Sequence, residues 1–242
     1  MDVSPALAPV LRLLPSGGDE GGEDLRSRAR RAAVVPNGNE PLAELWEELV
    51  TGREHAVDAF IDDERCFLVT RPARPDERLP ALVNPRNRAI LTRVLLGEPQ
   101  KHVAYEFGVS ASSITSIAKQ YAQAMGFESS VSRLPIFLVV AAHAAARGLT
   151  EAMAASATFE HDGVRHRVLC AARPDPARWA NLSEKECEVV TLLVERYPNA
   201  DIARLRQRSP RTVANQLSSV MHKTGARGRC EIIYRMLEGR AS

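Results

Sequence analysis

Residues 202–217 read IARLRQRSPRTVANQL, with helix-forming residues at both ends and a polar break between them. The break ends at Ser209 and Pro210, a pair that opens helices. The serine side chain accepts hydrogen bonds from the free N–H groups of the first turn, and proline loses no hydrogen bond at the first helical position. The stretch therefore predicts a short helix, a turn and a second, capped helix. Four arginines crowd this junction: Arg204, Arg206, Arg208 and Arg211.

The same pattern occurs 99 residues earlier in the chain. A shift of 99 residues without any gap superimposes residues of related character, namely Asn84 on Ser183, Pro99 on Pro198, Val103-Ala104 on Ile202-Ala203, Ser110 on Ser209, Ile114 on Val213, Ala118 on Leu217, Tyr121 on Val220 and Gly126 on Gly225. This period is far longer than the repeat of a solenoid protein, so it predicts an internally duplicated chain.

Each copy is preceded by a helix-like and a strand-like segment. Residues 41–52 have apolar side chains at helical spacing, and residues 134–148 (LPIFLVVAAHAAARG) are typical of a buried helix that ends at Gly148. Two β-prone runs flank residues 62–64, and a second pair flanks residues 161–163 (HDG). An isolated hairpin is only marginally stable, so the two hairpins must pack on helices or join each other. We favour one small, pseudo-symmetric sheet.

The sequence thus predicts a mainly α-helical protein with small β-hairpins. Two tandem helix-turn-helix domains are each preceded by a helix and a β-hairpin, and a last helix covers residues 230–238. The first unit is expected at residues 40–148 and the second at 149–242. Residues 1–39 are rich in proline, glycine and charge and predict a disordered N-terminal tail. The arginines at 26–31 in this tail fit a solvated arm or a contact with phosphate.

The second helix of each predicted pair has one apolar and one polar face. In the first unit Ile114, Ala118 and Tyr121 recur at helical spacing and predict a core face. The opposite face holds Ser112, Thr115, Ser116 and Lys119 in the first unit and Arg211, Ala214, Asn215 and Ser218 in the second. Short polar side chains let a helix approach base edges in the major groove. Two helices joined by a short turn are also common in proteins that bind no DNA, so this spacing leaves both interpretations open.

Charge is distributed unevenly along a chain that is nearly neutral overall. Residues 151–242 contain 15 Lys/Arg and 11 Asp/Glu, a net charge of +4, whereas residues 40–150 contain 12 and 14, a net charge of −2. The C-terminal third is therefore the better candidate for binding an anionic partner.

Residues 182–233 resemble the LuxR-type DNA-binding domain of bacterial transcription regulators. The residues that carry the resemblance are Leu182-Ser183, Val189-Val190, Ile202-Ala203, Ser209 with Arg211-Thr212-Val213, Lys223 with Gly225, and Arg229 with Glu231-Ile232. The first unit is similar in its middle, where residues 103–115 (VAYEFGVSASSIT) fit the family's turn better than the second unit does.

The resemblance implies which residues contact DNA. Base-reading positions fall on Thr115, Ser116 and Lys119 in the first unit and on Ala214, Asn215 and Ser218 in the second. Phosphate contacts fall on Thr212, Lys223 and Arg227, to which the basic junction adds Arg211. Family members dimerise through the fourth helix, so a homodimer would use residues 135–147 or 230–238.

The second unit departs from the family pattern at its turn. Arg206, Gln207 and Arg208 stand where the family has an apolar residue, glycine or asparagine, and an aliphatic residue. This departure predicts a turn that is distorted or re-registered around Leu205. The first unit keeps the turn but lacks the arginines, which leaves open that one unit has kept the fold and lost DNA binding.

Two functions fit these observations. The first is a sequence-specific DNA-binding transcription regulator of the bacterial cytoplasm and nucleoid, whose tandem units act on double-stranded DNA as a pseudo-dimer. The second is an adaptor that binds RNA polymerase or another regulator through a unit that no longer binds DNA. The acidic residues that precede the first unit suit such a surface, and they suit a solvated face equally well.

Other classes of protein have little support in the sequence. No P-loop, Gly-x-Ser-x-Gly or HExxH motif is present, so an enzyme is not expected, and no cofactor is implied. His161, Asp162 and His166 fit a solvated hairpin tip better than a metal site. The widely spaced cysteines (Cys66, Cys170, Cys187 and Cys230) predict reduced core thiols. We expect neither a signal peptide nor a membrane span, because no apolar run approaches about 20 residues.

Overall fold

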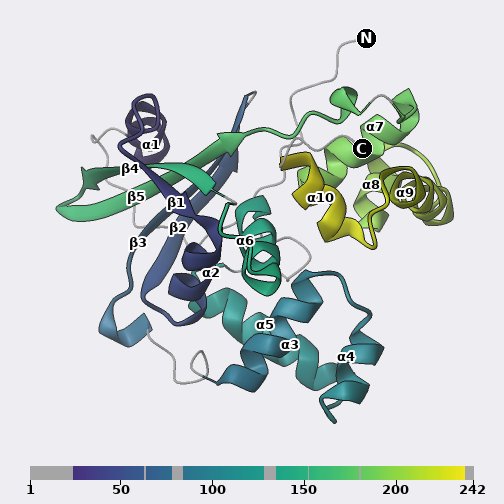
Figure 1. The fold of residues 1–242 in the computed structure, drawn as a ribbon, viewed down its shortest axis with the longest axis horizontal. Helices are drawn as coiled ribbons and strands as arrows, with labels where there is room; N and C mark the ends of the chain where they lie inside the picture. The colour runs from purple at the N-terminus through teal and green to yellow at the C-terminus, as the bar shows by residue number, and fades with distance from the viewer. Residues whose placement is uncertain are drawn as a thin grey trace.

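The computed structural model describes residues 24–62, 64–77, 84–127, 135–151, 153–179 and 181–237. Its centre is a five-stranded antiparallel sheet with helices on both faces. Two further groups of helices lie around this centre. In Figure 1 the group α3–α5 is at the bottom and the group α7–α10 is at the right.

The two predicted hairpins form and join in one sheet of order β1-β4-β5-β3-β2. The strands are β1 Gly38–Pro41, β2 Glu54–Ile61, β3 Arg65–Pro72, β4 Met153–His161 and β5 Val164–Ala172. The first hairpin is β2–β3 and the second is β4–β5, and β3 pairs with β5 in the middle. Val69 lies opposite Val168, and these positions are 99 residues apart. A pseudo-two-fold axis between the hairpins therefore passes through this pair, and the prediction of a small pseudo-symmetric sheet is confirmed.

The second hairpin closes with a two-residue loop. His161 pairs with Val164, and the intervening Asp162 and Gly163 both have positive φ, at 52° and 69°. Positive φ at both central positions defines the type I′ turn, whose twist matches that of the flanking strands. The predicted turn at residues 161–163 is thus confirmed.

One face of the sheet is covered by helix α1, Leu25–Ala32. Ala29 packs in a cluster with Phe60 and Phe67 from the first hairpin, and the Arg26 guanidinium donates to the Asp58 carboxylate at 2.6 and 3.0 Å. The prediction of a disordered tail is therefore wrong for residues 24–39, because α1 and β1 are held by contacts with distant strands. The arginines of α1 do not form a solvated arm either. Residues 1–23 of the predicted tail lie outside the described residues.

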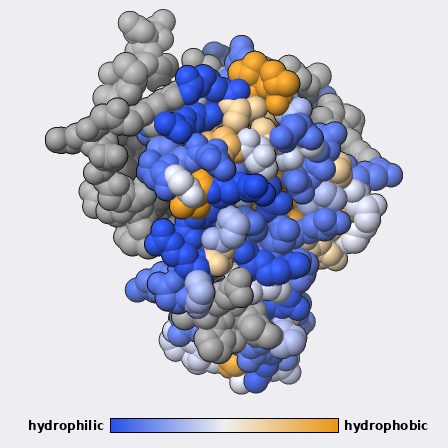
Figure 2. All heavy atoms as spheres, turned by 90° about the vertical axis from the view of Figure 1, so that its left-hand side faces the viewer, coloured by the Kyte–Doolittle hydropathy of each residue, from blue (hydrophilic) through white to orange (hydrophobic). Residues whose placement is uncertain are grey.

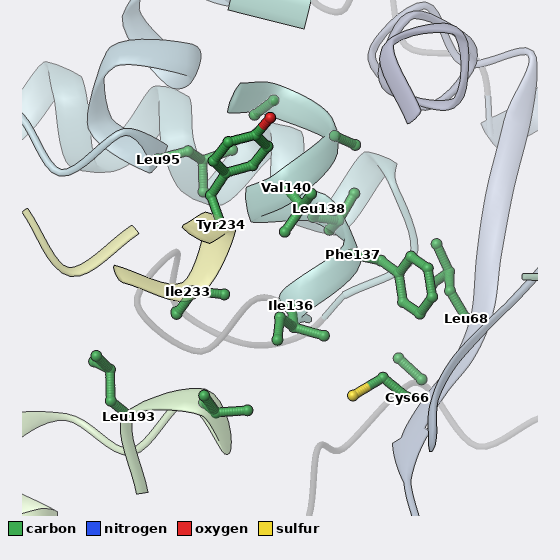
Figure 3. Close-up of a cluster of buried hydrophobic side chains, with 14 of the residues drawn as sticks. Cys66, Leu68, Leu95, Ile136, Phe137, Leu138, Val140, Leu193, Ile233 and Tyr234 are labelled. Carbon is green, nitrogen blue, oxygen red and sulfur yellow. The ribbon is translucent and has the colours of Figure 1, made fainter. Parts of the chain in front are cut away.

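The other face of the sheet packs on helices α2, Leu42–Val50, and α6, Ile136–Arg147. Residues 136–144 of α6 are all buried, so this helix is apolar on every side, as a central helix must be. Figure 3 shows side chains of β3, α6 and the helical groups gathered around it. Gly148 ends α6 in the left-handed conformation (φ 62°), which confirms the buried helix predicted from residues 134–148.

The two helical groups follow the hairpins with equal spacing. The first group consists of α3 Pro85–Leu95, α4 Gln100–Glu106 and α5 Ala111–Ala124, and the second of α7 Glu184–Val194, α8 Asn199–Leu205, α9 Pro210–Thr224 and α10 Arg229–Leu237. Short 3-10 helices, η1 Pro75–Glu77 and η4 Pro176–Arg178, precede them. The helices α3, α4 and α5 begin 99 residues before α7, α8 and α9, respectively. The cap predicted at Ser209 is present, and the side chains of Asn84, Ser110 and Ser209 all accept hydrogen bonds from backbone N–H groups.

Helices α6 and α10 pack against each other within the chain. The rings of His143 and Tyr234 stack with a centroid distance of 4.0 Å, and Ile232, Ile233 and Met236 of α10 are buried. The same chain covers the apolar faces of the described part of residues 135–147 and 230–238, the segments through which we predicted a homodimer, and the homodimer itself stays a prediction. Residue 238 lies outside the described residues.

Three of the four cysteines are core residues. Cys66, Cys170 and Cys230 are buried and Cys187 is half-buried, all as free thiols. Burial raises the pKa of the Cys66 thiol to about 12, so this cysteine stays protonated at neutral pH. The prediction that the cysteines are core residues is confirmed for these three, and their reduced state stays a prediction.

The face of the molecule that forms the left-hand side of Figure 1 is mainly hydrophilic. Figure 2 shows this face, and hydrophobic residues appear on it only as separate spots. Among the described residues, no helix combines the length and the apolar character needed to cross a membrane.

Candidate nucleic-acid interface

The turn between α8 and α9 has the same geometry as the turn between α4 and α5. Gln207 adopts φ 52°, and its counterpart Gly108 adopts φ 58°. The N–H of Arg208 donates to the Ala203 carbonyl at 2.8 Å, as the N–H of Val109 does to the Ala104 carbonyl at 3.0 Å. The prediction of a distorted or re-registered turn around Leu205 is therefore wrong. Gln207 takes the left-handed conformation that the family pattern assigns to glycine or asparagine.

The two turns should respond differently to substitution, because only Gln207 carries a Cβ in the left-handed conformation that it shares with Gly108. A residue with a Cβ is disfavoured in this conformation by about 1–2 kcal/mol, part of which glycine returns through its greater freedom in the unfolded chain. We expect Gln207→Gly to stabilise the protein by about 0.5 kcal/mol and Gly108→Ala to destabilise it by about 1 kcal/mol. Urea denaturation measures both changes, and a loss of stability in Gln207→Gly would contradict this account of the turn.

Arg206 turns into the protein and does not face solvent. Its side chain is only 11% exposed and forms an ion pair with Glu188 of α7, with Nη2 2.8 Å from Oε2. Its Nη1 donates to Gln216 of α9 at 2.6 Å. The stem of Arg206 thus occupies the place of the family's apolar residue, while its charged end ties α7 to α9.

Helix α9 carries the predicted DNA-contacting residues on its solvent side. Val213, Leu217 and Val220 are buried against the other helices of the group. All the predicted site residues of this unit are exposed: Arg211, Thr212, Ala214, Asn215, Ser218, Lys223 and Arg227. No acidic residue occurs between Pro210 and Thr224, so this face presents donors and positive charge to an anionic partner.

Two of the arginines at the turn are available to a ligand. Arg208 and Arg211 are exposed, and neither guanidinium has an ion-pair partner within the described part of the chain. Arg204 is 77% exposed and lies 3.4 Å from Asp201. Arg208 is not among the residues predicted to contact DNA, although the arginine-rich junction that suggested DNA binding contains it. It lies at the turn, immediately before the capped end of α9.

Lys223 has a structural partner beneath the exposed face. Its ammonium lies 2.7 Å from the carboxylate of Glu186 in α7, which also accepts from Ser219 at 2.7 Å and from the Ser183 N–H at 2.7 Å. Burial opposes ionisation of Glu186, but these hydrogen bonds outweigh it and lower the pKa of Glu186 to about 2. Lys223 therefore helps to hold α9 on α7 in addition to presenting charge at the surface.

Replacement of Glu186 by glutamine is expected to destabilise the protein by about 2 kcal/mol, a usual value for hydrogen bonds to a charged group. Because the pKa of Glu186 is depressed from 4.5 to about 2 by folding, its contribution is present above about pH 4.5 and is lost as the pH falls towards 2. Urea denaturation at neutral pH and near about pH 3 should show a smaller acid-induced loss in Glu186→Gln than in the wild type.

Glu184→Gln is the matched control for this prediction, because Glu184 is an exposed carboxylate in the first turn of the same helix. Its loss should cost less than about 1 kcal/mol, as for other exposed charges near a helix N-terminus. If the two variants lost equal stability at neutral pH and responded equally to acid, the role assigned to Glu186 would be incorrect.

Residues 180–236 match the family model of bacterial regulatory proteins, luxR family. They form a LuxR-family helix-turn-helix domain. The family is a regulatory DNA-binding family, so the match supports a DNA-binding transcription regulator and gives no support for an enzyme. Comparisons with curated proteins and with solved structures gave no match.

The LuxR-family match does not include α3–α5, although this group has the same helix order and turn. Ile90, Val103 and Ile114 form its small core, and Ser112, Thr115, Ser116 and Lys119 are exposed on α5 as predicted. Its arginines are used internally: Arg86 donates to the Phe107 carbonyl, and Arg93 pairs with Glu98 and Glu106. Compared with the LuxR-family domain, this face carries little positive charge.

The histidines of the second hairpin are packed and are not a solvated tip. His166 is buried and stacks on Phe159 with a centroid distance of 5.5 Å, and burial lowers its pKa. His161 lies 3.3 Å from the Asp162 carboxylate. Throughout the described ranges, no group of three or more His, Cys, Asp or Glu side chains is arranged to hold a metal ion. The solvated-tip interpretation is therefore wrong for His166.

Proposed function

We propose that this chain is a sequence-specific DNA-binding transcription regulator in which two tandem LuxR-like helix-turn-helix units act as a pseudo-dimer. The observation that carries the proposal is the exposed, acid-free face of α9 with the unpaired guanidinium groups of Arg208 and Arg211, within residues that match the LuxR family. Such a protein would work in the bacterial cytoplasm at the nucleoid.

In this proposal the exposed face of α9 enters the major groove. Ala214, Asn215 and Ser218 face the base edges, where an asparagine can form two hydrogen bonds with adenine. Phosphate groups are bound by Arg211, Thr212, Lys223 and Arg227, to which we add Arg208. Phosphate contacts position a protein on DNA and base contacts give sequence specificity, so these two groups of residues have separable effects.

The second DNA-binding unit of the proposal is α3–α5, with Thr115, Ser116 and Lys119 at the base-reading positions and Ser112 beside them. Three observations support it: the 99-residue spacing of the helices, the matching turns at Gly108 and Gln207, and the exposure of these four residues. The contact between α6 and α10 would then take the place of a dimer interface. A single chain would thereby present two recognition helices.

An adaptor of the transcription machinery is the second candidate function. The exposed face of the α3–α5 group carries little charge, and Tyr105 on α4 is 88% exposed, in contrast to Arg204 at the corresponding position. Tyrosine is enriched at protein interfaces. In this alternative one or both helix-turn-helix units no longer bind DNA, and the chain contacts RNA polymerase or another regulator.

Binding of the full chain to random genomic duplexes tests the proposal. We expect measurable affinity in dilute buffer and a steep decline as salt rises, because each neutralised phosphate releases counterions. Asn215→Ala should then reduce the preference for a selected site over random sequence without lowering affinity for random sequence. If the protein bound no duplex even in dilute buffer, the adaptor would become the better account.

A further inference from the structure

The first helix-turn-helix group is fastened to the free edge of the sheet. The N–H of Ala56 in β2 donates to the Met125 carbonyl at 2.9 Å, and the His55 ring lies 3.2 Å from the Ala124 carbonyl. Gly126 approaches so closely that a Cβ there would lie 2.0 Å from the Ala56 carbonyl oxygen. The segment that ends α5 therefore sits directly on the outer edge of β2.

The corresponding edge of the second hairpin is occupied by β1. A bulge between Ala56 and Asp58 shifts the register of β2 by one residue. Ala56 lies opposite Thr70, and Ser156 lies opposite Leu169, which is 99 residues after Thr70. Ser156 in β4 is therefore the structural counterpart of Ala56 in β2. Ser156 is paired with Gly38 of β1, and the Ser156 carbonyl accepts from the Asn37 N–H at 3.0 Å. β1 thus occupies, on the outer edge of β4, the position that corresponds to that of the first helix-turn-helix group on the outer edge of β2.

The second helix-turn-helix group is consequently held in a different way. Gly225 corresponds to Gly126, but the nearest atom to a Cβ at Gly225 is Arg235 Nη1, at 3.3 Å, and no strand atom of the described residues lies within 4 Å of it. This group instead contacts the centre of the molecule through α10, which packs on α6. Figure 1 shows α7–α10 away from β1 and β4.

We infer that β1 excludes the second helix-turn-helix group from the corresponding position on the outer edge of β4 and thereby sets the spacing of the two DNA-binding helices. This inference rests on the proposed function, because it assigns a role on DNA to both groups. The α1–β1 segment is a positioning element in this scheme, and the ion pair between Arg26 and Asp58 and the burial of Ala29 anchor it. The two units then occupy half-sites at one preferred separation.

The β1 strand is the part of the sheet most easily displaced. It has four residues, includes Gly38 and Pro41, and pairs with the sheet along one side only, whereas β4 and β5 each have nine residues. Short edge strands with glycine and proline are weakly held. A change confined to β1 can therefore alter the placement of the second group while the hairpins remain paired.

The variant Ala29→Glu/Gly38→Cys/Ser156→Cys places this contact under redox control. A Cβ at residue 38 would lie 2.9 Å from the Ser156 side-chain oxygen, an approach that suits a disulfide. A carboxylate at the fully buried position 29 weakens the hold of α1, and therefore of β1, on the sheet. Oxidation locks β1 on β4, and reduction leaves it weakly held. The same molecule thus supplies the locked and the released state, and the wild type in the same two buffers controls for its native cysteines.

The experiment uses duplexes that carry the two half-sites located by footprinting of the wild type. Insertion of about five base pairs between them, half a helical turn, should reduce the affinity of the wild type and of the oxidised variant at least about tenfold. The same insertion should reduce the affinity of the reduced variant less than about threefold, because its second helix-turn-helix group is no longer held at one position relative to the first. General damage to the fold would lower affinity equally at both separations, so it would not produce this ratio.

Three results would overturn the inference. Equal penalties for the insertion in the oxidised and reduced variant would remove the role of β1 while leaving the proposed function intact. A footprint covering one half-site only would show that the two groups do not act together on DNA. Absence of binding to every duplex would remove the proposed function as well, and that outcome is recognised in the wild type before any variant is made.

Discussion

Replacement of both Arg208 and Arg211 by alanine should weaken the binding of duplex DNA about thirtyfold at physiological ionic strength. The slope of log affinity against log salt should also become shallower by about two. Each lost phosphate contact removes about 0.9 of this slope, and two such contacts correspond to about 1.5 log units near 0.15 M salt. Fluorescence anisotropy with one labelled duplex at several salt concentrations measures both quantities.

The expected effect is large because these guanidinium groups have no competing partner. Both are exposed, and no carboxylate of the described residues pairs with them. Arg206 is unsuitable for this test, since its loss would break the ion pair with Glu188 and destabilise the domain. Lys223 is unsuitable for the same reason, because Glu186 depends on it.

Arg53→Ala/Arg165→Ala is the matched control for the double variant. Both residues are exposed, Arg53 immediately before β2 and Arg165 in β5, so the control removes the same charge from outside α9. It should leave the salt slope unchanged within about 0.3 and the affinity within about threefold. If the two double variants weakened binding equally, net charge and not the α9 face would govern DNA binding.

Local sequence signals predicted much of this fold. Ser110 and Ser209 marked helix starts because a capping side chain acts on backbone groups within three residues of itself. The turn at Asp162 and Gly163 followed from the need for positive φ in a two-residue loop. The 99-residue correspondence was visible because it has no gap between the hairpin and the end of the second helix of each pair, and the structure repeats its helix starts at the same spacing.

Several of the incorrect predictions have one physical cause, which is that distant partners determine the structure. Composition made residues 24–39 resemble a disordered tail, but Arg26 finds Asp58 and Ala29 finds the apolar face of the sheet. The orientation of Arg206 depends on Glu188, 18 residues away, and no local pattern reveals it. The sequence did not reveal that α6, which is apolar on all sides, packs on α10 of the same chain.

The candidate site was predicted more completely than its supporting contacts. Every residue proposed to face DNA is exposed in the structure, because the 3.6-residue period separates the buried face of a helix from its outer face. The supporting role of Glu186 under Lys223 was missed. A signal for it exists in the sequence: Ser183 followed by Glu186 has the spacing of a capping box, which places this carboxylate at the start of α7.

Gly126→Ala should destabilise the protein by about 3 kcal/mol. The backbone at Gly126 has φ 99°, which is strained for any residue with a Cβ. The added Cβ would also lie 2.0 Å from the Ala56 carbonyl oxygen and 2.9 Å from His55 Nε2. The Ala56 carbonyl is part of the backbone and cannot rotate away as the end of a side chain can. Removal of this steric clash therefore requires α5 to separate from β2, with loss of the hydrogen bond that the Ala56 N–H donates to the Met125 carbonyl.

Gly225→Ala, at the corresponding position of the second unit, separates the two contributions to this loss. Gly225 also has positive φ (64°), but its added Cβ would meet only the end of the Arg235 side chain, at 3.3 Å. We therefore expect a cost of about 1 kcal/mol there, from backbone conformation alone. Urea denaturation of both variants gives the difference, which measures how tightly the first helix-turn-helix group is held on the sheet. Equal losses would mean that α5 is not fastened to β2, and a rigid placement of α5 on the sheet would then have no structural basis.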